Sequence, residues 1–209
     1  MTSARPWVLA TRSAGKLREL RPLFGDAGIE VIDLVEAGIA ESTDEESIES
    51  HATFEENARA KARYFYALCG GLDVVADDSG LCVDALGGAP GVRSKRWSGV
   101  DGTSHEVDVA NNAKLVASLA GVSTRRAQFV CAAAWHGEQG ELVVTGAVQG
   151  TIVESPSGAH GFGYDPYFRS SELGMTLADA TTEQKRLVSH RGRAFDTLLA
   201  GLRARGVVR

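Results

Sequence analysis

The fold is decided by the stretch RAQFVCAAAWHGEQGELVVTGAVQGTIVE, residues 126–154. It holds two long apolar segments, 126–136 and 140–154, separated by a short turn that contains glycine. This pattern predicts two strands joined as an antiparallel hairpin. Because the hairpin stands among segments that alternate between helix and strand, it favours a mixed sheet flanked by helices over a purely parallel, doubly wound one.

The remaining segments read as short strands and amphipathic helices. Strands are expected at 7–11, 29–34, 73–77 and 81–86. Helices are expected at 14–24, from Thr53 to 68, from Thr103 to 119, from Thr181 onward, and along the stripe of Phe195, Leu198, Leu199 and Leu202. Capping boxes open two of them, Thr53 with Glu56 and Thr103 with Glu106. We expect a mobile acidic loop at 36–50 and a glycine-rich loop at 155–166.

The amino-acid composition limits which classes of protein the chain can belong to. The 209 residues are 44% apolar and 23% charged, which predicts one domain spanning 1–209. The net charge of −5 argues against nucleic acid as a partner and requires local cations for any anionic substrate. Cys69, Cys82 and Cys131 form no CxxC pair, so we expect buried free thiols in a reducing compartment. No segment is long and apolar enough for a signal peptide or a membrane span, so we expect a cytoplasmic protein without a membrane partner.

Two stretches are candidates for binding phosphate. ATRSAGKLREL, residues 10–20, places Gly15 and Lys16 at a helix start, where backbone N–H groups and the helix dipole favour anions. It is not a Walker A loop, because Ala10 and Leu17 stand where that motif needs Gly and Ser or Thr. Asn57 and Lys61 lie four residues apart on one helix face. For each stretch the alternative is an ordinary surface helix.

The adjacent carboxylates Asp77 and Asp78 are the candidate catalytic and metal-binding pair. We expect them to end a strand ahead of a turn at Ser79-Gly80. Side chains alternate along a strand, so one carboxylate can face a cleft while the other supports the turn. A carboxylate there suits Mg²⁺ or a general base that activates water. An Asx-turn is the structural alternative.

Three further groups offer anion clamps, stacking faces and hydrogen-bond donors. Arg93, Lys95 and Arg96 follow a glycine-rich turn and suit an anion, unless they are a plain surface charge run. In the loop at 158–166, Phe162 and Tyr164 offer stacking faces, and Asp165 can accept from a ring N–H. Lys185, His190 and Arg191 are donors suited to ring carbonyls, or else a cap and a surface pair. Together with the two candidate phosphate-binding stretches, these groups predict a protein that binds a nucleoside triphosphate.

Five motifs in order give the chain a specific resemblance. They are similar to motifs of the Ham1-like, or inosine triphosphate pyrophosphatase, family, and read ATRSAGKLREL, TFEENARAKA, ADDSGLCVDALGGAPGV, SGAHGFGYDP and SHRGRA. The resemblance runs from about residue 8 to 202. It implies hydrolysis of ITP, dITP and XTP to the monophosphate and pyrophosphate, by attack at the α-phosphorus. It also implies a Mg²⁺-dependent homodimer with an elongated mixed α/β sheet of the Maf–Ham1 type, in two lobes around a central cleft.

The resemblance assigns roles residue by residue. Asp78 and Lys61 correspond to catalytic residues, and Asp78 and Glu49 to metal ligands. The substrate-binding positions are Thr11, Arg12, Ser13, Ala14, Gly15, Lys16, Asn57, Ser79, Arg96, Phe162, Gly163, Tyr164, Asp165, Lys185, His190 and Arg191.

The chain departs from the family pattern in three places. Ser13 replaces the usual Asn, Glu49-Ser50-His51 replaces an ETG triplet, and Gly174-Met175-Thr176 replaces Gly-Lys-Thr. These departures leave a nucleotide-binding module without catalysis as one alternative. A Maf-like nucleotide pyrophosphatase is another, against which SHRGRA and GFGYDP speak. A P-loop kinase or ATPase is disfavoured by the Walker A mismatch.

Overall fold

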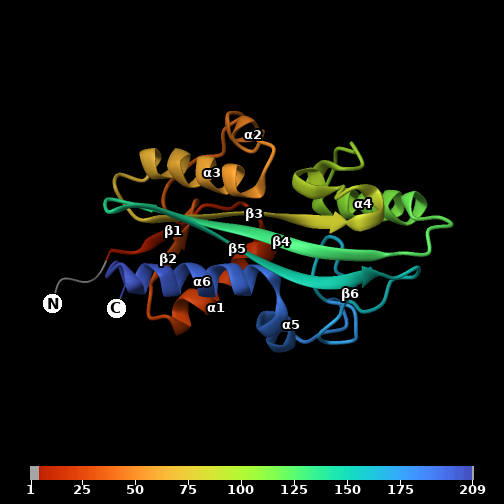
Figure 1. The fold of residues 1–209 in the computed structure, drawn as a ribbon. Helices are drawn as coiled ribbons and strands as arrows, with labels where there is room; N and C mark the ends of the chain where they lie inside the picture. Colours follow the sequence, from red (N-terminus) through yellow and green to blue (C-terminus); the bar gives the residue numbers. More distant parts are fainter. Residues whose placement is uncertain (1–4, 209) are drawn as a thin grey trace. The chain divides into compact units, whose positions relative to one another are not determined.

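The computed structural model describes residues 5–208, and its six strands form one mixed sheet (Figure 1). The strands are β1 (Trp7–Leu9), β2 (Val31–Asp33), β3 (Val74–Val83), β4 (Arg126–Gly137), β5 (Gly140–Ile152) and β6 (Phe168–Ser170). Their order in the sheet is β2-β1-β3-β4-β5-β6. Strand β1 pairs in parallel with β2 and β3, whereas β5 pairs antiparallel with β6. The α/β class and the mixed sheet predicted from the hairpin are therefore confirmed.

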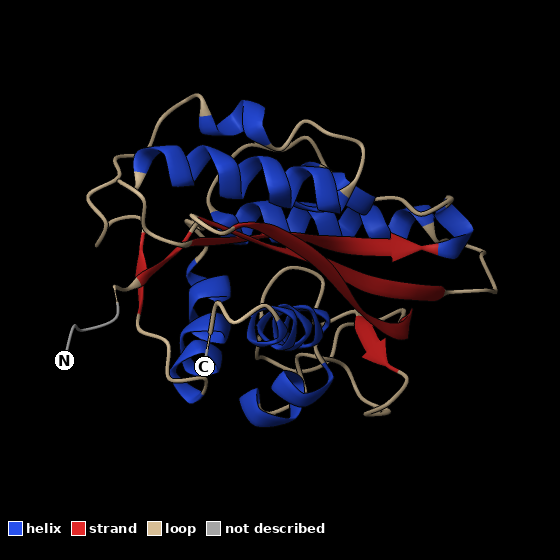
Figure 2. Cartoon of the chain, turned by 60° about the vertical axis from the view of Figure 1, so that its left-hand side comes forward, coloured by secondary structure: helices blue, strands red, loops and turns tan. Residues whose placement is uncertain are grey.

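Helices flank the strands (Figure 2). They are α1 (Ala14–Asp26), α2 (Glu45–Ile48), α3 (Phe54–Leu68), α4 (Ser104–Ser118), α5 (Thr182–Val188) and α6 (His190–Ala204), with 3₁₀ turns η1 (Asp84–Leu86) and η2 (Gly91–Arg96). Side chains of Thr53, Thr103 and Thr181 cap the N-termini of α3, α4 and α5 as expected. Among the described residues, no helix combines the length and apolar character that crossing a membrane needs.

The chain divides into two compact units. Unit 1 comprises 1–78, 131–146 and 191–209, and unit 2 comprises 79–130 and 147–190. In unit 1, an apolar cluster joins β1 and β4 to helices α1 and α6, with Trp7, Phe24, Trp135 and Phe195 in edge or tilted ring contacts. In Figure 1, α3 covers the opposite face of these strands. The cluster takes in Trp7 and Leu9 of β1 and Val75 of β3, two residues before the candidate Asp77.

Unit 2 has its own apolar cluster. Leu81 and Val83 of β3, Leu115 and Leu119 of the α4 region, and Phe168 of β6 are fully buried within it. The cluster also takes in Tyr164 of the glycine-rich loop, so this loop is anchored to the core of the unit. The expected single domain and central cleft stay predictions.

The structure corrects several sequence predictions. The predicted strands 73–77 and 81–86 are joined in one continuous strand, β3, which ends at Val83, and the turn expected at Ser79-Gly80 is wrong. Residues 84–86, also predicted as strand, form the 3₁₀ turn η1. Gly80 is buried within β3, and the apolar runs 74–76 and 81–83 lie on either side of the polar residues beside it. The acidic stretch 36–50 is not all loop, since it contains the single-turn helix α2. Strand β6 was not predicted, because Phe168 is the only apolar residue of its three.

Candidate active site

The first candidate site in unit 1 is the loop between β1 and α1. Ser13 is the N-cap of α1, and its Oγ accepts a hydrogen bond from the backbone N of Lys16. The buried Thr11 accepts from the backbone N of Ser13 at 3.2 Å. The side chain of Ser13 therefore satisfies the N-terminus of α1. Ala14 and Gly15 form the first turn of the helix, and their backbone N–H groups belong to the set that a helix leaves without an internal acceptor.

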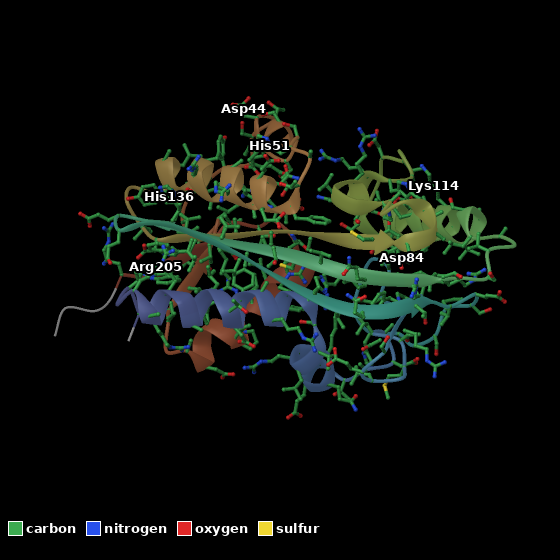
Figure 3. The ribbon with its side chains drawn as sticks, in the orientation of Figure 1. Asp44, His51, Asp84, Lys114, His136 and Arg205 are labelled. Carbon is green, nitrogen blue, oxygen red and sulfur yellow. The ribbon has the colours of Figure 1, made fainter. Side chains whose placement is uncertain are left out.

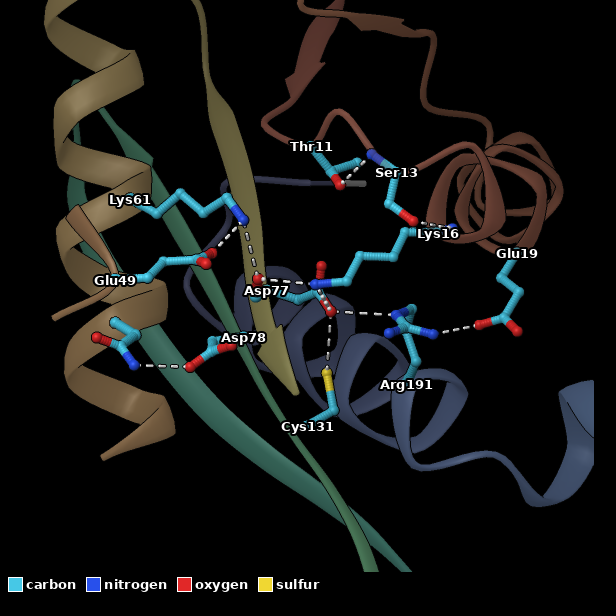
Figure 4. Close-up of polar contacts among 11 residues, drawn as sticks. Thr11, Ser13, Lys16, Glu19, Glu49, Lys61, Asp77, Asp78, Cys131 and Arg191 are labelled. Carbon is cyan, nitrogen blue, oxygen red and sulfur yellow. Dashed lines mark hydrogen bonds and ion pairs between the residues drawn. The ribbon is translucent and has the colours of Figure 1, made fainter. Parts of the chain in front are cut away.

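Asp77 is the centre of a buried ion network that sequence reasoning did not predict (Figure 4). Its Oδ2 lies 3.0 Å from Lys16 Nζ and 3.1 Å from Arg191 Nε, and Cys131 Sγ lies 3.8 Å away. Arg191 also pairs with Glu19. Burial alone would raise the pKa of Asp77, but Lys16, Arg191 and Lys61 outweigh it and hold that pKa well below its usual range.

Asp78 lies on the opposite side of β3 from Asp77, and its pKa is shifted in the opposite direction. Its Oδ2 accepts a hydrogen bond of 2.8 Å from Nδ2 of the fully buried Asn57 (Figure 4). Burial first, and then the negative charge of Glu49, raise the pKa of Asp78 to about 6. The pKa values of two neighbouring aspartates are thus shifted in opposite directions: Asp77 stays ionised, and Asp78 takes up a proton as the pH falls through about 6, which is a mark of acid–base sites.

Lys61 and Glu49 form the third part of the unit 1 set. Glu49 Oε1 lies 2.5 Å from Lys61 Nζ, which also lies 3.5 Å from the backbone oxygen of Asp77. Burial opposes ionisation of both groups. Their mutual attraction outweighs it, so the pKa of Lys61 is raised and that of Glu49 is lowered. Lys16, Asn57, Lys61 and Asp78, expected from sequence, are therefore brought together.

The carboxylates can be tested as holders of a metal ion. Among residues 5–208, no three His, Cys, Asp or Glu side chains are grouped to bind a metal ion by themselves. The charge of Glu49 nevertheless acts on Asp78 strongly enough to raise its pKa. Two carboxylates without further protein ligands match the chemistry of Mg²⁺, which keeps several waters and takes substrate phosphate as ligands. The pair fits that ion.

The two arginines predicted to bind substrate in unit 1 have partners inside the protein. Arg191 is almost fully buried, with Asp77 and Glu19 as partners of its guanidinium. Arg12 is held by Glu45 and by two backbone carbonyls. A hollow of about 90 Å³ is lined by Thr11, Arg12, Leu17, Asp33, Leu34 and Val35. It is much smaller than a nucleotide pocket.

In unit 2, Asp165 organises the glycine-rich loop. Its Oδ2 accepts from the backbone N of Phe162 at 2.9 Å and from Lys185 Nζ at 2.7 Å. Lys185 Nζ also lies 4.9 Å from the centre of the Phe162 ring, a cation–π contact. Gly161 requires glycine, because its φ is +79° and a Cβ would come within 2.1 Å of Asp165 Oδ2.

The expected stacking role of Tyr164 is corrected. Its ring is buried in the core of unit 2, and its hydroxyl donates to the backbone oxygen of Ser94 at 2.9 Å. Next to it, Gly163 is fixed from α4, since its N donates to Asp108 and its O accepts from Asn112. These two side chains were missed because their spacing to the loop in sequence is more than fifty residues.

The other unit 2 candidates lie at separate places. His190 stacks on Phe129, with ring centres 4.8 Å apart and an interplanar angle of 12°. Ser79 lies half-buried on β3, and Arg96 is exposed at the end of η2 with the other two cations of that segment. Asn111 holds η2 in place by donating to the backbone oxygens of Ser94 and Lys95.

Comparison with known proteins agrees with this mixed sheet. The chain belongs to the Ham1 family, whose sequence profile matches residues 7–201. A relative from Bordetella parapertussis, named dITP/XTP pyrophosphatase, is 47% identical over 204 residues, covering 96% of this chain and 92% of that one.

Two solved structures give the same result. The Staphylococcus aureus Ham1 protein has a TM-score of 0.81 at 36% identity, over 96% of this chain and 100% of that one. A nucleoside-triphosphatase, or dITP/XTP pyrophosphatase, from Mycobacterium abscessus has a TM-score of 0.71 at 42% identity, over 93% and 99%.

Proposed function

We propose that the chain hydrolyses the non-standard purine nucleoside triphosphates ITP, dITP and XTP to the monophosphate and pyrophosphate, and so removes them from the nucleotide pool. The observation that carries the proposal is the contrast between Asp77 and Asp78 beside two lysines. Support comes from the relatives that are 46–47% identical and carry the name dITP/XTP pyrophosphatase.

The unit 1 residues supply the chemistry of this step. Lys16, Lys61 and the backbone at the start of α1 attract the triphosphate charge. With a pKa of about 6, the Asp78 carboxylate is mostly ionised at neutral pH and can accept a proton from water. The water oxygen bonds to the α-phosphorus, the bond from that phosphorus to the bridging oxygen breaks, and pyrophosphate leaves.

We propose Mg²⁺ as the cofactor, with Asp78 and Glu49 as the residues that would hold it. When bound, this ion neutralises phosphate charge and polarises the phosphoryl oxygens. The protein's own contribution is to keep two carboxylates close while Lys61 offsets the charge of Glu49.

Selection of the base is assigned to unit 2. Hypoxanthine and xanthine carry an oxygen at the 6-position, where adenine carries an amino group. Donors such as Lys185 and His190 can donate hydrogen bonds to that oxygen, whereas adenine would leave them without an acceptor. Lys185 is ordered by Asp165 and Phe162, and His190 by Phe129, so both are held before any base binds. The homodimer implied by the resemblance is part of the same proposal.

A turnover panel tests the proposal. Purified protein is given ITP, dITP, XTP, ATP and GTP, with and without Mg²⁺, and released pyrophosphate is measured. We expect turnover of the first three in Mg²⁺, little of ATP and GTP, and almost none for Asp78→Asn. Tight binding of ITP by wild type without turnover would support the nucleotide-binding module instead. Light scattering on the same sample tests the dimer.

A further inference from the structure

Arg12 makes four hydrogen bonds from its five guanidinium N–H groups, all of them to one segment of unit 1. Its Nε and Nη2 lie 3.2 and 2.7 Å from the two carboxylate oxygens of Glu45, a bidentate pair. Nη1 donates to the backbone oxygen of Ile39 and Nη2 to that of Ala40, each at 3.0 Å. The resemblance predicts that this loop binds substrate, but the Arg12 side chain is directed at the acidic segment.

The segment that Arg12 holds leads directly to Glu49. Glu45 is the first residue of α2, and Glu49 follows the last residue of this single turn. Glu49 in turn pairs with Lys61 at 2.5 Å. The segment is therefore fastened at two points, and Asp44 and His51 mark the chain on either side of α2 (Figure 3).

Little else stabilises this segment. Of the residues from 40 to 49 whose side chains the structure describes, none is fully buried. Asp44, the N-cap of α2, makes no side-chain capping bond. A single helical turn is unstable by itself, and segments with few buried contacts open locally at low free energy. The Arg12–Glu45 pair is thus one of the two ion pairs that fasten α2 and the residue after it.

We propose that Arg12 is a positioning residue, which acts through Glu45 to hold Glu49 against Lys61. The consequence for turnover rests on the proposed function, whereas the consequence for the order of α2 does not. An arginine is required because its planar fork bonds both carboxylate oxygens and the two carbonyls together, which the point charge of a lysine cannot do.

A double-mutant cycle distinguishes positioning from direct contact with phosphate. We expect Arg12→Ala and Glu45→Ala each to lower kcat for ITP about tenfold with little change in KM, and the double variant to be no worse than either. Arg12→Lys should behave like Arg12→Ala. Additive losses, a raised KM for Arg12→Ala alone, or a near-normal Arg12→Lys would each overturn the proposal.

Hydrogen–deuterium exchange gives a readout that does not need turnover. Amides of 41–50 should exchange about tenfold faster in Arg12→Ala and in Glu45→Ala than in wild type, since their opening free energy falls. Arg63→Ala is the matched control, because it removes a bidentate pair with Glu141 that does not involve α2. Unchanged exchange in the first two variants would overturn the proposal. Exchange as expected in a wild type that does not hydrolyse ITP would overturn the proposed function alone.

Discussion

Replacing either of the two adjacent aspartates, Asp77 or Asp78, by asparagine is predicted to change the free energy of unfolding, but in opposite directions. The folded-state pKa of Asp78, about 6, lies above its ordinary value of 3.8. The folded state therefore binds the proton more tightly than the unfolded state, and the ionised Asp78 destabilises the protein at high pH. A difference of about 2 pKa units corresponds to about 3 kcal/mol. Asp78→Asn removes this cost and keeps an oxygen for Asn57.

We expect Asp78→Asn to raise the free energy of unfolding by about 3 kcal/mol at about pH 8. The advantage should shrink as the pH falls through about 6, and vanish below about 4, where wild type is protonated in both states. Turnover of ITP should be almost lost at every pH. Gain of stability with loss of activity is the expected signature of a strained functional carboxylate.

Asp77→Asn is the matched comparison. The same substitution there leaves Lys16 and Arg191 buried without their shared carboxylate, so we expect a loss of about 3–5 kcal/mol. Because the folded pKa of Asp77 is depressed, its contribution is present at neutral pH and lost in acid. The assay is urea denaturation of metal-free protein in EDTA over a series of pH values. The reasoning is refuted if Asp78→Asn is no more stable than wild type at about pH 8.

Three further predictions concern single contacts. Glu49→Gln should lower the pKa of Asp78 from about 6, as followed by carbon-13 NMR of its carboxyl in metal-free protein; an unchanged value would show that Glu49 does not act on it. Thr103→Ala should cost about 1 kcal/mol in urea denaturation by removing the cap of α4, and no loss would contradict the capping assignment. Tyr164→Phe should cost about 1 kcal/mol by removing the bond to the Ser94 carbonyl, with KM for ITP unchanged; a raised KM would restore Tyr164 to the substrate contacts.

Sequence reasoning located the elements better than the partners within them. The hairpin predicted the mixed sheet, and threonine caps predicted the starts of α3, α4 and α5, because both signals are local. The break expected in β3 was wrong because a glycine in a buried strand looks like a turn in sequence. In the candidate site, the alternation of Asp77 and Asp78 indicated two faces.

The side chains that contact these two faces of β3 could not be predicted from the neighbouring sequence. Glu19 and Cys131 reach Asp77 and its partner Arg191 from distant parts of the chain. Nor could the sequence show that Arg12 points at α2 and that Tyr164 is buried, since both facts depend on tertiary packing. Charge and residue type indicated the chemistry, but the direction of each side chain required the structure.

The central claim, that water attacks the α-phosphorus, is tested most directly by isotope transfer. ITP is hydrolysed by the protein in water enriched in oxygen-18, and the two products are separated and weighed by mass spectrometry. Attack at the α-phosphorus predicts the heavy oxygen in IMP and none in pyrophosphate. Label in pyrophosphate, or release of inorganic phosphate with IDP, would contradict the account.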